Sequence, residues 1–200
     1  MSLSILVVCT GNVCRSPLAE QLLAVRLEAA GVDATVRSAG TQALVGEAMT
    51  REAVELSVRY GGGGGTHAAT QLTNVLIEAA DLVLTASREH RAVVASMVPR
   101  AARISYTIRE FARVAEFLEL DNESTLALAQ ATTPDAFIEL ASTSRGFATP
   151  PAQSGSDDIV DPYRRSTQIY EESGRAIDAA ATAIVRALST ASRLGSRGAA

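Results

Sequence analysis

The sequence contains no lysine and no tryptophan, and only 4% of its 200 residues are aromatic. The 18 basic residues are therefore all arginine, which we attribute to codon bias in a GC-rich genome, and 22 acidic residues leave a net charge of -4. A chain with this charge has no strong attraction to polyanions. We therefore expect neither nucleic acid nor an anionic membrane as its main partner.

Cysteine and histidine are scarce, with two of each. Cys9 and Cys14 lie five residues apart, which is not the pattern of a disulfide framework. His67 and His90 do not stand at ligand spacing from a thiol or from each other, so no metal is expected. We interpret both histidines as surface or capping residues.

Long apolar segments are also missing. The opening MSLSILVVC has no basic residue before its apolar run, and this run is too short for a signal peptide or a membrane span. We predict a cytoplasmic protein that is a monomer or a weak dimer. With 47% hydrophobic residues, the chain can bury the core of one domain. We place this domain at 1–190, followed by a disordered tail over 191–200.

Apolar, β-branched runs alternate with segments of helical periodicity. This alternation is typical of a parallel sheet covered by helices on both faces. The sequence therefore predicts a three-layer α/β/α sandwich around a four-stranded parallel sheet. The predicted strands are 3–8, 34–38, 81–85 and 102–107, and the predicted helices are 17–30, 47–60, 70–80, 88–98, 108–120 and 167–188.

Two segments fall outside this alternation. Residues 61–65 are five glycines that follow a helix rather than a strand, so they do not match the dinucleotide-binding fingerprint and are interpreted as a flexible connection. Residues 121–156 are rich in Ser, Thr, Ala and Pro and are long for a loop in a compact domain. We predict an insertion or a lid here, with a helix over 134–144.

The stretch VVCTGNVCRSPLAEQ at 7–21 ends a buried strand in a cysteine and then enters a helix. Unpaired N–H groups at a helix start favour an anion, and Gly11 and Asn12 tolerate the positive φ angles that make successive N–H groups converge. A thiol at Cys9 would experience a positive potential, which favours the thiolate. Arg15 can place its planar fork on two phosphate oxygens, and Ser16 can donate a hydroxyl to the sulfur. A lone buried cysteine is usually inert, but this combination indicates a reactive site.

The segment from Cys9 to Pro17, CTGNVCRSP, resembles the signature loop of the low-molecular-weight protein tyrosine phosphatases. A second match lies in DDIVDPYRRS, where Asp161-Pro162-Tyr163 is similar to the family's Asp-Pro-aromatic loop and also precedes the last helix. Weaker similarities are SAG at 38–40 and DLVLTAS at 81–87. The resemblance covers about 1–115 and 157–190 and leaves the insertion unmatched.

The resemblance implies an enzyme that hydrolyses phosphotyrosine proteins or small phosphomonoesters through a cysteinyl-phosphate, with no cofactor and no metal. It assigns Cys9 as the nucleophile, Arg15 as the anion ligand and Asp161 as the general acid and base. Tyr163 would form a wall of the cleft. The loop residues implied in substrate binding are Thr10, Gly11, Asn12, Val13, Cys14 and Ser16, with Asn12 bracing the loop and Ser16 stabilising the thiolate.

Several of these residues also allow a structural interpretation. Asp161 could cap the last helix, and Tyr163 could pack on it. Cys14 could be a small buried residue, or it could form a protective disulfide with Cys9 under oxidation. We interpret Asp157 and Asp158 as a solvated acidic run. The pair at 164–165, two arginines, is either a positive cleft edge that favours acidic phosphosites or a solvated pair.

Three other functions compete with a tyrosine phosphatase. Val13 stands where the resemblance indicates Thr in protein-arginine phosphatases, so it favours phosphotyrosine. Arsenate reduction would need an external thiol, because the chain has no cysteine beyond Cys14. A non-catalytic phosphate-binding module is disfavoured because candidates for both the nucleophile and the acid are present.

Overall fold

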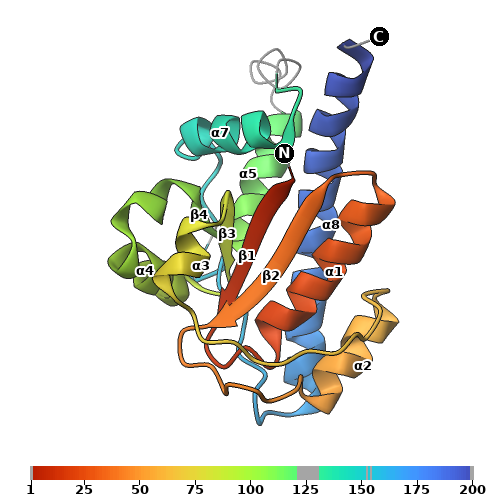
Figure 1. The fold of residues 1–200 in the computed structure, drawn as a ribbon, viewed down its shortest axis with the longest axis vertical. Coiled ribbons are helices and arrows are strands. Elements are labelled where there is room, and N and C mark those ends of the chain that lie inside the picture. The colour runs from red at the N-terminus through yellow and green to blue at the C-terminus, as the bar shows by residue number, and fades with distance from the viewer. Residues whose placement is uncertain (1, 121–130, 152, 154, 199–200) are drawn as a thin grey trace.

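The computed structural model describes residues 2–120, 131–151, 153 and 155–198 (Figure 1). Its four strands form one sheet in the order β2-β1-β3-β4, and every neighbouring pair is parallel. The predicted fold class is confirmed. The strands are β1 (Leu3–Cys9), β2 (Ala34–Gly40), β3 (Leu82–Thr85) and β4 (Ser105–Thr107).

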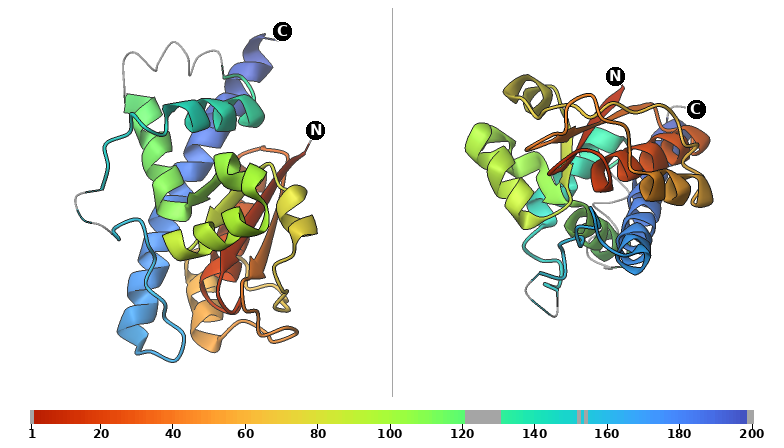
Figure 2. Two further views of the ribbon diagram at one scale, coloured as in Figure 1. Left: turned by 90° about the vertical axis from the view of Figure 1, so that its left-hand side faces the viewer. Right: turned by 90° about the horizontal axis from the view of Figure 1, so that it is seen from below.

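Helices cover both faces of the sheet (Figure 2). One face carries α1 (Arg15–Ala29), α5 (Ile108–Leu120) and α8 (Thr167–Gly198), with α2 (Arg51–Arg59) and α7 (Pro134–Ser144) packed against them. The other face carries α3 (Asn74–Glu78), α4 (Arg88–Met97) and the 3₁₀ helix η1 (Pro99–Ile104).

Strand β1 lies in the middle of the sheet and is buried on both faces. Because side chains alternate along a strand, Ile5 and Val7 join the core beneath α1, α5 and α8, whereas Leu6 and Val8 join the core beneath α3 and α4. The strand is thus an apolar run with no solvent-exposed face, as the sequence predicted. Cys9 is the last residue of β1, so it lies at the end of the sheet where the strands terminate, between the two helical layers.

Three predicted elements have other bounds in the structure. The strand predicted over 102–107 begins only at Ser105, because the preceding chain forms η1. The Ser105 hydroxyl donates back to the Ala101 carbonyl of η1 at 2.7 Å. The helix predicted over 47–60 begins only at Arg51, after Thr50 caps its amino end. Residues 41–49 are therefore available as a loop. The helix predicted over 70–80 is reduced to α3.

Helix α8 is longer than predicted. Its buried stripe continues beyond residue 188 through Ser189 and Ala191, so the backbone stays helical to Gly198. The helix thus continues through residues 191–198 of the predicted tail, and residues 199–200 lie outside the described residues. No helix in the described part of the chain is both long and apolar enough to cross a membrane.

The described part of the predicted insertion is a packed element. Helix α7 occupies the predicted residues 134–144, and its Phe137 ring meets the Phe111 ring of α5 edge-on with centroids 6.2 Å apart. Figure 1 shows α7 near the amino end of β1, away from Cys9 at the other end of the strand. Residues 121–130 of the predicted insertion lie outside the described residues.

Candidate active site

The backbone carbonyls of the loop between β1 and α1 accept hydrogen bonds from the segments that surround the loop. Since a carbonyl and the N–H of the same peptide unit point in opposite directions, carbonyls that face outward turn the N–H groups of residues 10–14 toward the interior. Such a nest suits an anion. The outward contacts are Cys9 O with Thr41 N, Thr10 O with Gln42 N, Gly11 O with Leu44 N and Val13 O with Thr50 N, all at 2.9–3.0 Å, and Asn12 O with His67 Nε2 at 2.6 Å.

Asn12 fixes the curvature of this loop. It has a φ of 56°, a left-handed conformation that asparagine tolerates better than most residues, and its side chain is fully buried. Its Nδ2 donates to Ser16 Oγ at 2.9 Å and to Ser38 Oγ at 2.8 Å, and its Oδ1 accepts from Thr70 N at 2.7 Å. These three bonds tie the loop to α1, β2 and the segment before α3.

The sulfur of Cys9 lies 2.9 Å from Ser16 Oγ. Ser16 Oγ accepts from Asn12, and its hydroxyl can donate either to the sulfur at 2.9 Å or to the Ala39 carbonyl at 3.5 Å. Ser16 has no accessible surface and Cys9 is almost fully buried. The thiol and its hydroxyl partner therefore form a fixed pair beneath the loop.

Arg15 projects from the first turn of α1 and is 5% exposed. Its Nη1 donates to Ile159 O at 3.2 Å, and its Nη2 lies 2.8 Å from Asp161 Oδ2. Its buried Nε has no hydrogen-bond partner among the described residues. The other Asp161 oxygen accepts from Tyr163 N at 3.2 Å, so both carboxylate oxygens are engaged within the site.

A cavity of about 210 Å³ joins these residues. All of the predicted site residues line it except Asn12 and Ser16, which lie beneath the loop and support it. Tyr163, 37% exposed, is a wall of the cavity. None of the described residues from the predicted insertion lines the cavity, and the insertion or lid over 121–156 stays a prediction. Gln42 and Leu44 also line it and carry no signal in the sequence, because their loop reaches the site only through long-range backbone contacts.

The two histidines contact the loop, so their interpretation as surface residues is wrong. His90 is buried, with Nε2 2.8 Å from Thr10 Oγ1 and Nδ1 2.7 Å from Ser87 Oγ. Burial, with the nearby Arg15 guanidinium, lowers the pKa of His90 to about 4. The side chain is therefore neutral near pH 7. The N-cap of α4 is Ser87, whose hydroxyl accepts from the His90 backbone N–H at 3.4 Å, so His90 itself is not the capping residue.

His67 closes a ring of hydrogen-bonding groups below the loop. Its Nε2 contacts Asn12 O, and its Nδ1 lies 4.0 Å from Glu20 Oε2. The same Glu20 oxygen accepts from Ser38, which in turn accepts from Asn12. Burial raises the pKa of Glu20. Sequence spacing gives no sign of this ring, because its members come from four separate segments.

Cys14 lines the cavity as a packed thiol. It is buried, with its sulfur 3.4 Å from Thr50 Oγ1 and 3.6 Å from Tyr170 Oη, and burial raises its pKa. Both Cys9 and Cys14 are free thiols in this structure.

The strand-loop-helix unit and its surroundings have counterparts in known proteins. Residues 4–130 match the family model described as low molecular weight phosphotyrosine protein phosphatase. The chain belongs to this family. A protein-arginine-phosphatase of Bacillus subtilis is 38% identical over 54% of this chain and 72% of its own length. The low molecular weight protein-tyrosine-phosphatase Etp of Escherichia coli K12 is 42% identical over 48% of this chain, but the match spans only 62% of that relative.

Solved structures of the family extend the similarity to nearly the whole chain. The tyrosine phosphatase AmsI of Erwinia amylovora superposes with a TM-score of 0.66 at 25% identity, covering 94% of both chains. A YwlE arginine phosphatase mutant with a phosphorylated active site serine gives a TM-score of 0.68 at 26% identity, covering 96% of this chain and 99% of that one. The family therefore includes proteins named for phosphotyrosine and for phosphoarginine.

Proposed function

We propose that this family member is a cysteine-dependent phosphatase that hydrolyses phosphotyrosine through a cysteinyl-phosphate intermediate. The observation that carries the proposal is the loop after β1, whose outward carbonyls leave a nest of N–H groups beside the Cys9 sulfur. The unpaired Nε of Arg15 adds a donor that a phosphate oxygen would satisfy.

In the first step, the Cys9 thiolate attacks phosphorus and the bond to the leaving oxygen breaks. The loop N–H groups and Arg15 hold the equatorial oxygens, where charge must be stabilised through the transition state. Asp161 gives its proton to the leaving oxygen. In the second step, Asp161 takes a proton from water, whose oxygen attacks phosphorus and releases free phosphate and the Cys9 thiolate.

The walls of the cavity support an aromatic substrate. Tyr163 and Leu44 line the cavity, and both are partly exposed. A phenyl ring between them would bury apolar surface and place its oxygen near Asp161. Val13 offers no hydroxyl to a guanidinium group, which favours phosphotyrosine over phosphoarginine. A phosphotyrosine protein is thus the proposed partner. The cytoplasmic location and the monomeric or weakly dimeric state remain predictions.

The proposal is tested by hydrolysis of p-nitrophenyl phosphate and of a phosphotyrosine peptide at mildly acidic pH. We expect wild-type activity on both and none for Cys9→Ser; equal rates in the two proteins would remove the proposed function. Assays with a phosphoarginine peptide, and with arsenate plus an external thiol, address the competing reactions. Phosphate binding without hydrolysis of any ester would instead indicate a binding module.

A further inference from the structure

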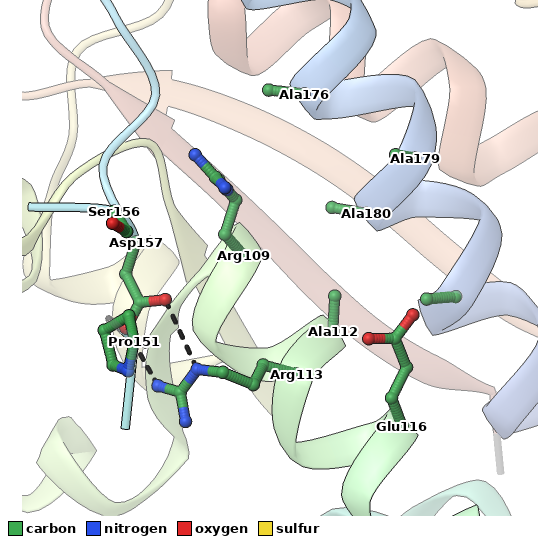
Figure 3. A pocket seen from close by; sticks show the side chains of 11 residues that line it. Arg109, Ala112, Arg113, Glu116, Pro151, Ser156, Asp157, Ala176, Ala179 and Ala180 are labelled. Carbon is green, nitrogen blue, oxygen red and sulfur yellow. Dashed lines mark hydrogen bonds and ion pairs between the residues drawn. The ribbon is translucent and has the colours of Figure 1, made fainter. Parts of the chain in front are cut away.

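Two consecutive aspartates precede the proposed acid, and they are not the solvated run that the sequence suggested. The Asp157 carboxylate makes two contacts with Arg113 of α5, at 2.8 Å to Nη2 and 3.4 Å to Nε (Figure 3). Its side chain is only 13% exposed. This ion pair stands beside a cavity of about 370 Å³ between α5 and α8, whose other lining is mostly alanine.

Asp158 is held from the opposite layer of the sandwich. Its Oδ1 accepts from the backbone N–H of Arg88 at 2.7 Å, at the amino end of α4. Its Oδ2 accepts from Arg88 Nη2 at 3.1 Å and from Arg88 Nε at 3.3 Å. A carboxylate in this position also benefits from the helix dipole. Neighbouring aspartates are thus fixed to α5 on one side and to α4 on the other.

The main chain continues this attachment up to the acid. Ile159 N donates to Ala86 O at 2.8 Å, just beyond the carboxyl end of β3, and Ile159 O accepts from Arg15 at 3.2 Å. Asp161 follows two residues later and is itself half-exposed. The exposed carboxylate therefore extends from a segment that two ion pairs and two backbone contacts fix in place.

We propose that Asp157 and Asp158, with Arg113 and Arg88, are positioning residues for the general acid Asp161. This inference rests on the proposed function, in which Asp161 protonates the leaving oxygen. Proton transfer needs the acid within hydrogen-bond reach of that oxygen, and a displacement of about 1 Å can cost roughly 100-fold in rate. Without the two ion pairs, the segment 157–161 would no longer hold Asp161 at the position that proton transfer needs. The loop around Cys9 would keep its own hydrogen bonds.

The proposal predicts that the loss of kcat/KM in variants of Asp157 and Asp158 depends on the leaving group of the substrate. Phenolate needs protonation as it departs, whereas p-nitrophenolate leaves readily without it. The measurement is kcat/KM, which reports the first chemical step, for phenyl phosphate and for p-nitrophenyl phosphate. We expect Asp158→Asn and Asp157→Asn to lower kcat/KM about tenfold more for phenyl phosphate. The inhibition constant of inorganic phosphate, which reports the loop and Arg15, is expected to stay within about twofold of wild type.

The matched control is Glu119→Gln, which removes the ion pair between α5 and Arg186 of α8 at a distance from the site. It should leave the ratio of the two kcat/KM values unchanged. Asp161→Asn is measured alongside. If Asp161→Asn loses more kcat/KM for phenyl phosphate than for p-nitrophenyl phosphate, but Asp157→Asn and Asp158→Asn do not, the inference is overturned and the proposed function stands. If Asp161→Asn itself lacks the dependence, the acid assignment fails and the inference fails with it.

Discussion

Arg15 and Asp161 form a 2.8 Å ion pair across the cavity that contains Cys9. The arginine is buried and the aspartate is half-exposed. This carboxylate is the anion beside the guanidinium. In the proposed reaction, a phosphoryl group that binds Arg15 competes with this carboxylate for the guanidinium.

The first prediction concerns Asp161→Asn. Loss of the proton donor should lower turnover of phosphotyrosine roughly 100-fold or more. Inorganic phosphate should bind as tightly as before or more tightly, because the carboxylate no longer competes for Arg15. Steady-state rates and the phosphate inhibition constant measure both effects. Near-normal turnover would contradict the acid assignment.

The second prediction concerns Asn12→Ala. The substitution removes three buried hydrogen bonds and places alanine at a φ of 56°. We expect the free energy of unfolding to fall by about 3 kcal/mol, since the Thr70 N–H left without its acceptor costs ~1–3 kcal/mol and the left-handed backbone about 1–2 kcal/mol. We also expect kcat to fall at least about tenfold as the nest loses its shape.

Asn12→Gly is the matched variant for this position. Glycine adopts the same φ without strain but loses the same three bonds. It should therefore recover part of the stability in urea unfolding and little of the activity. Wild-type kcat in the alanine variant would show that the loop does not depend on this side chain.

The strand-helix alternation made the sheet and the loop around Cys9 predictable. The apolar run of β1 is buried on both faces because it lies at the centre of the sheet, and its end fixed the place of Cys9. Arg15 and Ser16 follow within one loop, so their proximity to the sulfur could be inferred from local spacing. Asp161 could be placed only through the family resemblance, because it lies 145 positions after Ser16 in the sequence.

The supporting contacts could not be predicted in the same way. His67, His90 and the loop at 41–49 reach the site through tertiary packing, and their own neighbours in the sequence carry no sign of it. Asp157 and Asp158 look like solvated charges because their arginine partners lie 44 and 70 residues away. An aspartate forms an ion pair here only because its segment packs against a helix that carries an arginine, and the local sequence does not show this packing.

The third prediction concerns substrate choice at Val13. Val13→Thr adds a hydroxyl to the cavity wall without a large change in volume, so it should raise hydrolysis of a phosphoarginine peptide. The hydroxyl can bond a guanidinium, whereas the valine methyl cannot. Parallel kcat/KM values for phosphoarginine and phosphotyrosine peptides measure the change. An unaltered ratio would show that this position does not select the substrate here.

The fourth prediction concerns stability at low pH. The pKa of His90 is about 4 in the folded protein and ordinarily 6.5, so between these values the unfolded chain binds the additional proton. Stability from this group is fully present above pH 6.5 and is lost as the pH falls toward 4. We expect a loss of about 2 kcal/mol between pH 7 and pH 5.

Urea unfolding at the two pH values isolates this contribution when wild type is compared with His90→Gln. The variant keeps a side chain able to bond Thr10 but cannot take up a proton. Its loss of stability on acidification should be smaller than that of wild type by about the same 2 kcal/mol. Identical losses in both proteins would mean that His90 does not titrate in this way.

The central claim is that the Cys9 sulfur attacks phosphorus, and trapping the intermediate tests it most directly. The protein is denatured during turnover of p-nitrophenyl phosphate and digested, and the peptide that carries both cysteines is fragmented in a mass spectrometer. We predict one phosphoryl group on Cys9, none on Cys14, and neither label nor turnover in Cys9→Ala. Phosphate transferred to another residue, or normal turnover by Cys9→Ala, would contradict the account.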